Sequence, residues 1–366
     1  MTKTIMLAAG GSGGHLFPAM ALAEELGQRG YIVDLATDPR CDRYGTNFPA
    51  RNIHRIPSAT VESRSPLALT KTAVTLAGGV RKAHKIIGEV QPAAVIGFGG
   101  YPSFPPVVAA ALRSIPTALH EQNAVLGRAN RMLASRVSAI ATSFESVKYI
   151  TEDLAGKVRL TGNPVRSVVI ENSKRRYLAP TADGSINLLV FGGSQGARFL
   201  SDFVPPGIVS LPEHIRSRIV VMQQCREEDL ERVRQVYAEA DVHATCETFF
   251  PDLPEWIAEA HLVIGRGGAT TIAELTALGR PSVLIPLPHS VDNDQLFNAT
   301  RLAEAGAAWC IEQKDLTPER LTDGLVGVFS STEELASAAE AAHALGRPDA
   351  VYNLADLVEE LVGGNS

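Results

Sequence analysis

The segment TIMLAAGGSGG, residues 4–14, is the clearest indication of the fold, because its apolar run ends in a cluster of glycines. The run, residues 5–9, is too short for the hydrophobic region of a signal peptide and leads directly into glycines. We therefore predict a β-strand followed by a glycine loop. The next stretch, FPAMALAEELGQRG (17–30), spaces its apolar residues as an amphipathic helix does and ends at Gly30. Strand, glycine loop and helix in this order are typical of βαβ units and parallel sheets.

The same pattern recurs along the rest of the chain. Further strands are predicted in YIVDLATD (31–38), AAVIGFGG (93–100), PTALHEQN (116–123), INLLVFGGSQGAR (186–198), RIVVMQQ (218–224), HLVIGRGGATTIAEL (261–275) and PSVLIPLP (281–288). An Asn-Pro turn signal in TGNPVR (161–166) separates the two series, and a length of 366 residues favours two domains. We predict an α/β fold of two Rossmann-like domains, residues 1–163 and 164–345, with an interdomain cleft.

Charge is divided unevenly between the two halves. Residues 1–160 hold 18 Lys and Arg against 11 Asp and Glu, although the whole chain has a net charge of -6. A basic half favours an anionic partner. The sequence has no RNA-binding aromatic motif, helix-turn-helix signature or zinc finger, so we expect an anionic membrane surface and no nucleic acid.

Two features limit the class of protein further. The four cysteines, Cys41, Cys225, Cys246 and Cys310, are scattered without a CxxC pair, which favours reduced thiols and no zinc site. Residues 90–112 carry no charge and are long enough to cross a bilayer, but seven Pro and Gly residues would break a spanning helix. We expect a buried strand, a glycine loop and a helix start there.

Four predicted strand-to-helix junctions are rich in glycine, at residues 10–15, 97–100, 192–197 and 265–269. Glycine lets the backbone turn sharply and lets a ligand approach closely, and the N–H groups of the following helix start favour phosphate. Such loops lie at the carboxyl ends of strands, where open α/β sheets bind ligands. One loop alone is weak evidence, but loops of this kind in both halves indicate a ligand site.

Two other nucleotide-binding classes fit this pattern poorly. In GSGGHL, Leu16 stands where a dinucleotide-binding motif would have its third glycine, and no Walker lysine follows any of the loops. Asp38 ends the second predicted strand, where a ribose-binding acid could lie, but the glycine loop before it has the wrong shape. A dehydrogenase and a P-loop NTPase are therefore disfavoured.

Six segments of the chain resemble the MurG-type transferases, the lipid II synthases of peptidoglycan assembly. They are LAAGGSGGHLFPAMALAEEL, GFGGYPSFPPVVAA, HEQNAVLGRANR, TGNPVR, FGGSQGAR and GRGGATTIAEL…GRPSVLIPLPHSVDNDQLFNA, and they run in order from residue 5 to about 310. The resemblance implies a GT-B fold whose final helix, about 346–366, packs back on the first domain. It implies inverting transfer from UDP-GlcNAc to lipid I without a metal or other cofactor, and acceptor binding in the first domain with donor binding in the second. Other cell-wall synthesis proteins are possible partners.

The resemblance also implies the donor contacts. The residues that match the family's UDP-GlcNAc-binding positions are Ser12, Gly13, Gly14, Asn123, Arg166, Ser194, Phe250, Ala269, Thr270, Thr271, Ile272, Ala273, Glu274 and Gln295. Arg166 would stabilise the charge of departing UDP, Phe250 would bind uracil through its backbone, and Glu274 would accept the ribose hydroxyls. A helix N-terminal acid without any ligand is the alternative for Glu274.

One segment departs from the family pattern. Asp294 stands where relatives often have a second Gln, and Asp292-Asn293-Asp294 imitates the DxD metal signature of another glycosyltransferase class. Such short acidic patterns are common by chance, and a diphosphate here would already have helix and arginine partners. We therefore interpret 292–294 as a loop and expect no metal.

Two residues are candidates for the base that removes the proton of the acceptor hydroxyl. His15 ends the first glycine loop, and an imidazole ordinarily titrates in the range that a base needs. Glu121 in HEQN is the second candidate, as the base itself or as the partner that orients the histidine. The sequence does not separate them, and a loop-shaping helix cap is the alternative role for His15. His120 is interpreted as a packed residue, and the role of Tyr101 stays open.

Residues 66–85 combine apolar and basic side chains. The apolar ones are Leu67, Leu69, Val74, Leu76 and Val80, and the basic ones are Lys71, Arg81, Lys82 and Lys85. This mixture suits peripheral docking on anionic lipid at the cytoplasmic face of the membrane, although a helix packed on the sheet would show it as well.

The sequence leaves three alternative functions open. They are a GT-B transferase that uses a UDP-sugar with another acceptor, a UDP-GlcNAc 2-epimerase and a non-catalytic sugar-nucleotide sensor. HEQN and the basic first half argue against the first alternative, and the intact GGSGGH loop argues against the sensor.

Overall fold

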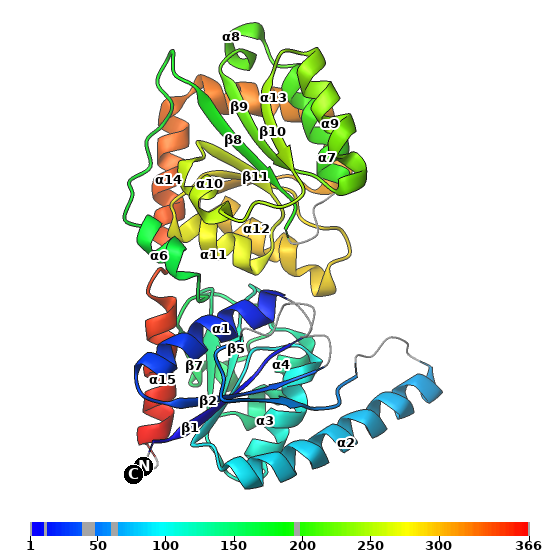
Figure 1. The fold of residues 1–366 in the computed structure, drawn as a ribbon, viewed down its shortest axis with the longest axis vertical. Helices are drawn as coiled ribbons and strands as arrows, with labels where there is room; N and C mark the ends of the chain where they lie inside the picture. The colour runs from blue at the N-terminus through cyan, green and yellow to red at the C-terminus, as the bar shows by residue number, and fades with distance from the viewer. Residues whose placement is uncertain (1, 11–12, 39–47, 60–64, 194–197, 365–366) are drawn as a thin grey trace. The chain divides into compact units, whose positions relative to one another are not determined.

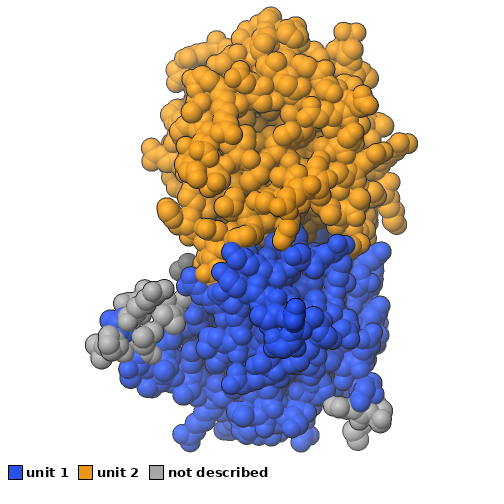
Figure 2. Space-filling model, turned by 180° about the vertical axis from the view of Figure 1, so that it is seen from behind, with its two compact units in different colours: residues 1–166, 349–366 blue, residues 167–348 orange. Residues whose placement is uncertain are grey.

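The computed structural model of the chain describes residues 2–10, 13–38, 48–59, 65–193 and 198–364, without the side chains of 66–69. The protein divides into two compact units (Figure 2). Unit 1 comprises residues 1–166 and 349–366, and unit 2 comprises residues 167–348. The chain thus leaves unit 1 once and returns to it for its last helix.

Unit 1 is a seven-stranded parallel sheet in the order β3-β2-β1-β4-β5-β6-β7 (Figure 1). The strands are β1 (Thr4–Ala8), β2 (Ile32–Thr37), β3 (Asn52–Arg55), β4 (Ala94–Gly97), β5 (Thr117–Glu121), β6 (Ala139–Thr142) and β7 (Val158–Leu160). The direction of strand addition reverses between β1 and β4. The carboxyl ends of these two strands therefore form the topological switch point, where open α/β sheets bind ligands.

Helices cover both faces of the first sheet. They are α1 (Gly13–Gln28), α2 (Pro66–Val90), η2 (Tyr101–Ser103), α3 (Phe104–Ala111), α4 (Arg128–Leu133), η3 (Ala134–Arg136), α5 (Glu152–Ala155) and α15 (Ala350–Gly363). On β1, Ile5 and Leu7 pack in a core cluster with α1 and α15, while Met6 and Ala8 pack in a second cluster with α2 and α3. Burial on both faces explains why the strand is a continuous apolar run and does not alternate.

Unit 2 repeats this architecture with six parallel strands in the order β10-β9-β8-β11-β12-β13. The strands are β8 (Ile186–Phe191), β9 (Ile219–Gln224), β10 (His243–Glu247), β11 (Leu262–Gly265), β12 (Ser282–Leu284) and β13 (Ala308–Cys310). Its switch point lies between β8 and β11. The predicted α/β fold with parallel sheets in two domains is therefore confirmed.

The helices of unit 2 also form two layers (Figure 1). They are α6 (Ser167–Asn172), α7 (Arg198–Val209), α8 (Glu213–Arg216), α9 (Glu227–Glu239), α10 (Leu253–Glu259), α11 (Ala269–Ala277), η4 (Val291–Asn293), α12 (Asp294–Glu304), η5 (Gln313–Asp315), α13 (Pro318–Ser330) and α14 (Thr332–Leu345). Apolar residues of α7, α9 and α13 pack on alternate residues of β8 in one core cluster. Helices α10 and α14 both lie against α11, which follows β11.

The uncharged stretch 90–112 folds within unit 1. It contains strand β4, a glycine turn, η2 and α3, as the sequence predicts. Among the helices of the described residues, none is both long and apolar enough to cross a bilayer.

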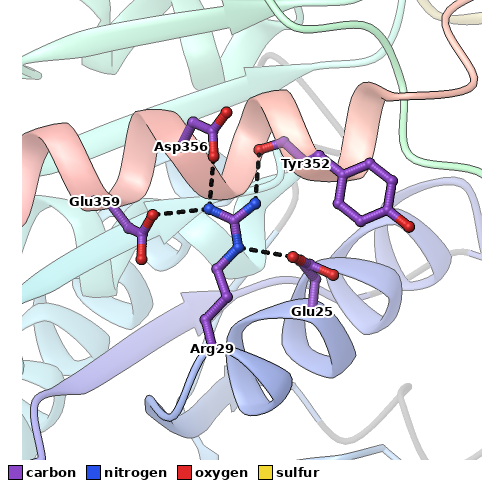
Figure 3. A network of polar contacts seen from close by, with 5 residues as sticks. All are labelled: Glu25, Arg29, Tyr352, Asp356 and Glu359. Atoms are coloured by element: carbon purple, nitrogen blue, oxygen red, sulfur yellow. Dashed lines mark hydrogen bonds and ion pairs between the residues drawn. The ribbon is translucent and has the colours of Figure 1, made fainter.

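Helix α15 is fastened to α1 by apolar packing and by one arginine. Leu354, Ala355 and Val358 lie in the same core cluster as Leu22 and Leu26 of α1. At the edge of this packing, the guanidinium of Arg29, just after α1, donates to Glu25 at 2.7 Å, to Asp356 at 2.6 Å and to Glu359 at 2.8 Å (Figure 3). The Tyr352 carbonyl accepts a further bond from the same guanidinium. One cation thus ties three carboxylates from helices at opposite ends of the chain.

We expect Arg29→Ala to loosen α15, because it leaves Asp356 and Glu359 close together without their shared cation. Partly exposed ion pairs contribute modestly, so the free energy of local opening should fall by about 1–2 kcal/mol, or about 5- to 30-fold in the opening equilibrium. Hydrogen exchange followed by mass spectrometry would show faster exchange in peptides of α15 and unchanged exchange in unit 2. Arg301→Ala is the control, because the ion pair of Arg301 with Glu304 stays within α12. Equal protection of α15 in the Arg29→Ala variant and the wild type would contradict this role.

Candidate active site

The switch point of unit 1 brings His15 against two glycines. His15 lies in the first turn of α1, directly after the loop that follows β1, and is half-buried. A Cβ at Gly99 would lie 3.4 Å from His15 Cε1, and one at Gly100 would lie 3.3 Å from His15 Cδ2. Both glycines have positive φ, 85° and 70°. The imidazole therefore packs against backbone that needs glycine for its conformation and for its closeness to the ring.

Glu121, the last residue of β5, is 2% exposed, and its carboxylate is held by amide groups. It accepts bonds from the Asn123 N–H at 3.1 Å, the Gly127 N–H at 2.8 Å and the Asn130 Nδ2 at 2.8 Å, and a longer one from Asn123 Nδ2. Burial raises the pKa of Glu121, and these hydrogen bonds act in the opposite direction. The carboxylate thereby fixes the backbone of the segment after β5.

His15 Nδ1 lies within hydrogen-bonding distance of Gln122, 3.1 Å from its Oε1. The sequence offered Glu121 as the orienting partner, but its carboxylate is turned toward Asn123, Gly127 and Asn130. Gln122 was missed, although a signal existed. Side chains alternate between the two faces of a strand, so Gln122 is expected on the same face as His120, which lies two residues before it. That spacing was the signal.

His120 is fully buried beneath Gln122. Its Nε2 lies 2.9 Å from the Gly162 carbonyl, and its Nδ1 lies 2.9 Å from Gln122 Nε2. Burial lowers the pKa of His120 to about 4, so the ring is neutral at neutral pH. The interpretation of His120 as a packed residue agrees with its burial, but its polar contacts connect it to His15.

The remaining candidates of unit 1 come from separate segments of the chain. Gly13 and Gly14 begin α1, Asn123 is half-buried beside Glu121, and Arg166 is exposed at the last residue before unit 2. Ser12 lies outside the described residues.

In unit 2, the loop after β11 is built around Arg266. Its buried guanidinium donates to the carbonyls of Ile285 and Pro286 at 2.9 and 3.3 Å, and to Gln313 Oε1 at 2.9 Å. Burial lowers the pKa of Arg266 to about 10, which leaves it protonated at neutral pH. The sequence alone did not single out Arg266. Its carbonyl partners follow β12, and they come close to Arg266 only because β12 pairs with β11 in the sheet.

Gly267 in the same loop allows α12 to pack closely. A Cβ there would lie 2.4 Å from the Gln295 carbonyl oxygen, and buried Asn298 donates to the Gly267 carbonyl at 3.0 Å. The loop after β11 and the start of α12 are therefore fixed together.

Helix α11 begins directly after this loop. Gly268 is its N-cap, with φ of -70° and ψ of 144° in the extended region. Ala269, Thr270 and Thr271 are half-exposed there, so their N–H groups suit a phosphate. On the same helix, Ile272 and Glu274 are buried and Ala273 is half-buried.

Two other donor candidates follow strands β10 and β12 of unit 2. Phe250 is buried after β10, and its ring centroid lies 6.5 Å from that of Trp256. Gln295 in the first turn of α12 accepts a bond from the Leu287 N–H at 3.0 Å. Ser194 lies outside the described residues, as does the rest of the 194–197 loop.

The acidic tripeptide forms a turn at the start of α12. Asp292 and Asn293 have φ of 55° and 57°, and the Asp294 carboxylate accepts the Gln295 N–H at 2.7 Å. No three His, Cys, Asp or Glu side chains of the described residues are grouped to hold a metal ion.

The candidates described above thus form two sets. One set follows strands of unit 1 and the other follows strands of unit 2.

Comparisons with known proteins cover the whole chain. The model of the glycosyltransferase family 28 N-terminal domain matches residues 5–142, and that of the family 28 C-terminal domain matches residues 187–354. A protein of Chelativorans sp. is 48% identical over all of this chain and 96% of its own length, and one of Paramagnetospirillum magneticum is 49% identical over 99% and 98%. Both are named UDP-N-acetylglucosamine–N-acetylmuramyl-(pentapeptide) pyrophosphoryl-undecaprenol N-acetylglucosamine transferase.

A solved structure supports the same assignment. The crystal structure of Acinetobacter baumannii MurG matches 98% of this chain and 99% of its own with a TM-score of 0.80 at 29% identity. Since both family models and relatives of nearly the same length agree, the chain belongs to glycosyltransferase family 28 and, within it, to the MurG-type N-acetylglucosamine transferases with the GT-B fold.

Proposed function

We propose that this protein transfers GlcNAc from UDP-GlcNAc to the 4-hydroxyl of the MurNAc-pentapeptide of undecaprenyl-pyrophosphoryl lipid I, with inversion, giving lipid II and UDP. The observation that carries this proposal is the identity of 48% and 49% to transferases of that name over 96% and 98% of their lengths. The reaction belongs to peptidoglycan synthesis. The enzyme would act beside other cell-wall synthesis proteins, and its product would serve cell shape and cell division.

Inversion requires a base for the acceptor hydroxyl. His15 suits this role, because it is half-buried at the switch point of unit 1 and because imidazole is the side chain that ordinarily titrates near neutral pH. Glu121 suits a positioning role, because it is buried and its carboxylate already accepts bonds from two backbone N–H groups and two side-chain amides. We assign proton removal to His15 and the shaping of the acceptor site to Glu121.

Inversion also requires stabilisation of the departing diphosphate. The first turn of α11 offers the positive end of a helix dipole, with the backbone N–H groups of Ala269, Thr270 and Thr271. Arg166 and Ser194 would add a charge and a hydroxyl, Glu274 would accept the ribose hydroxyls, Phe250 would bind uracil and Gln295 would read the GlcNAc hydroxyls. Gly13, Gly14, Ser12 and Asn123 would complete the donor contacts from unit 1, which binds the acceptor.

The lipid-linked acceptor requires contact with a membrane, and α2 supplies a suitable surface. Four basic residues along the helix are exposed, and Val74 beside them is 68% exposed; the basic residues are Lys71, Arg81, Lys82 and Lys85. The other face of α2 packs on α3 through Ala83 and Ile87. We propose that this basic face docks the protein peripherally on anionic lipid at the cytoplasmic side of the membrane.

Transfer of labelled GlcNAc from UDP-GlcNAc to a synthetic lipid I analogue tests the function, with a chelator present. We expect labelled lipid product and an equal amount of released UDP, because the proposed diphosphate contacts need no metal ion. UDP-GlcNAc binding without transfer to lipid I would reject the proposed acceptor, and transfer to diacylglycerol in its place would favour the alternative lipid acceptor. Release of free sugar epimerised at C2 would indicate an epimerase.

Flotation with liposomes tests the membrane proposal. At low salt, the wild type should float with vesicles that contain anionic lipid and stay in solution with neutral vesicles. Each basic residue near such a surface contributes about 1 kcal/mol, so Lys82→Glu with Lys85→Glu should weaken binding by at least about tenfold. Lys174→Glu with Arg175→Glu changes the charge equally on exposed residues of unit 2 and should bind as the wild type does. Equal weakening by both pairs would mean that net charge and not the α2 surface governs binding.

A further inference from the structure

A chain of hydrogen bonds connects buried backbone to His15. It runs from the Gly162 carbonyl to His120 Nε2 over 2.9 Å, from His120 Nδ1 to Gln122 Nε2 over 2.9 Å, and from Gln122 Oε1 to His15 Nδ1 over 3.1 Å. His120 and Gln122 are 0% and 1% exposed, so water does not compete for these bonds. The direction of each bond can be derived from the groups that can only accept.

His120 has a single possible proton position. The Gly162 carbonyl can only accept, so Nε2 of His120 must carry the proton. Burial keeps this ring neutral, since it lowers the pKa to about 4. Nδ1 of His120 is then a lone pair and accepts an N–H of the Gln122 amide.

The Gln122 amide has a single possible orientation for the same reason. Its Nε2 lies 3.0 Å from the Phe98 carbonyl and 3.1 Å from the His120 carbonyl, and both can only accept. The reversed amide would place its oxygen against two carbonyl oxygens and the lone pair of His120. The amide oxygen therefore faces His15, and Nδ1 of His15 must donate to it.

We propose that Gln122, anchored by His120, is a positioning residue that holds neutral His15 in the Nδ1–H tautomer, so that Nε2 carries the lone pair that removes the acceptor proton. This inference rests on the proposed function, with His15 as the base. The bond from the acceptor 4-oxygen to the anomeric carbon forms as the bond from that carbon to the UDP oxygen breaks. The acceptor proton moves to His15 Nε2, and the UDP oxygen leaves with the bonding electrons. Gln122 Oε1 keeps its bond to Nδ1–H in the resulting imidazolium.

An amide at residue 122 suits this role better than a carboxylate. A neutral acceptor fixes the tautomer without stabilising the protonated ring as strongly as a negative charge would. A base for a neutral-pH reaction should be unprotonated before the reaction starts. The adjacent carboxylate of Glu121 is turned away and is held by its own amide donors.

Two substitutions of Gln122 distinguish a positioning role for His15 from a purely structural role in the fold. Gln122→Met removes the acceptor for Nδ1–H, and it should lower kcat by about 10- to 100-fold at every pH, with binding of UDP-GlcNAc unchanged, because general bases contribute about 10²–10⁴-fold. Gln122→Glu keeps an acceptor but adds a charge. Its second carboxylate oxygen would face the Phe98 and His120 carbonyls and His120 Nδ1, to which the amide donates, so this variant should be less stable. Its folded fraction should still be active at high pH, with the acidic limb of the pH–rate profile moved upward by about one unit or more.

The control is Gln223→Met, which removes a fully buried glutamine of unit 2 that accepts from the Tyr237 hydroxyl. It should lower stability without moving the pH profile. Losses of kcat in Gln122→Met and Gln122→Glu that follow only their loss of stability, with no shift of the acidic limb, would overturn the proposal.

Nitrogen-15 NMR of the ring nitrogens reads the tautomer without any substrate. The wild type should show His15 with protonated Nδ1 and bare Nε2, and His120 with protonated Nε2. His15 protonated at Nε2 in its neutral form would overturn the proposal even if the variants failed to fold. Failure of the wild type to glycosylate lipid I would reject the proposed function, while the NMR result would still decide the tautomer.

Discussion

The buried carboxylate of Glu121 is the constraint on which the site of unit 1 depends. A carboxylate that is 2% exposed loses most of its hydration, and amide donors must replace it. Asn123, Gly127 and Asn130 supply them, so the backbone after β5 has one favourable path. That path sets where Gln122 leaves the strand and therefore where its amide meets His15. A carboxylate bonded to protein amides can in this way determine the geometry of a base on a distant segment of the chain.

In unit 2, a buried positive charge fixes the loops in the same way as the buried carboxylate does in unit 1. Its buried cation, Arg266, is held by the carbonyls of Ile285 and Pro286 and by Gln313. In both units, a buried charge saturated by groups of the opposite polarity fixes loops at the carboxyl ends of parallel strands. Since these ends surround the switch point of each sheet, the fixed loops are the ones that carry the candidate ligand contacts. Preorganised groups of this kind stabilise charge during a reaction without having to move.

The sequence predicted the parts of the structure that depend on local patterns. Apolar runs that end in glycine indicated β1, β4, β8 and β11, because strands buried on both faces must be continuously apolar. Contacts between segments that are distant in the sequence could not be predicted. His15 and Gln122 are 107 residues apart, and Arg29 and Asp356 are 327 apart. Neither spacing nor periodicity relates such residues, so Gln122 and Arg266 were missed although their motifs were recognised.

The most direct test of His15 as the base compares His15→Gln with Glu121→Gln in single-turnover transfer of GlcNAc to a lipid I analogue, for variants that still bind UDP-GlcNAc. We expect His15→Gln to lower the rate of the chemical step by about 10²–10⁴-fold, the usual contribution of a general base, and to retain the fold. We expect Glu121→Gln to destabilise unit 1 and to lower the rate of the folded fraction far less. A folded Glu121→Gln variant without activity, beside an active His15→Gln variant, would contradict this assignment and make Glu121 the base.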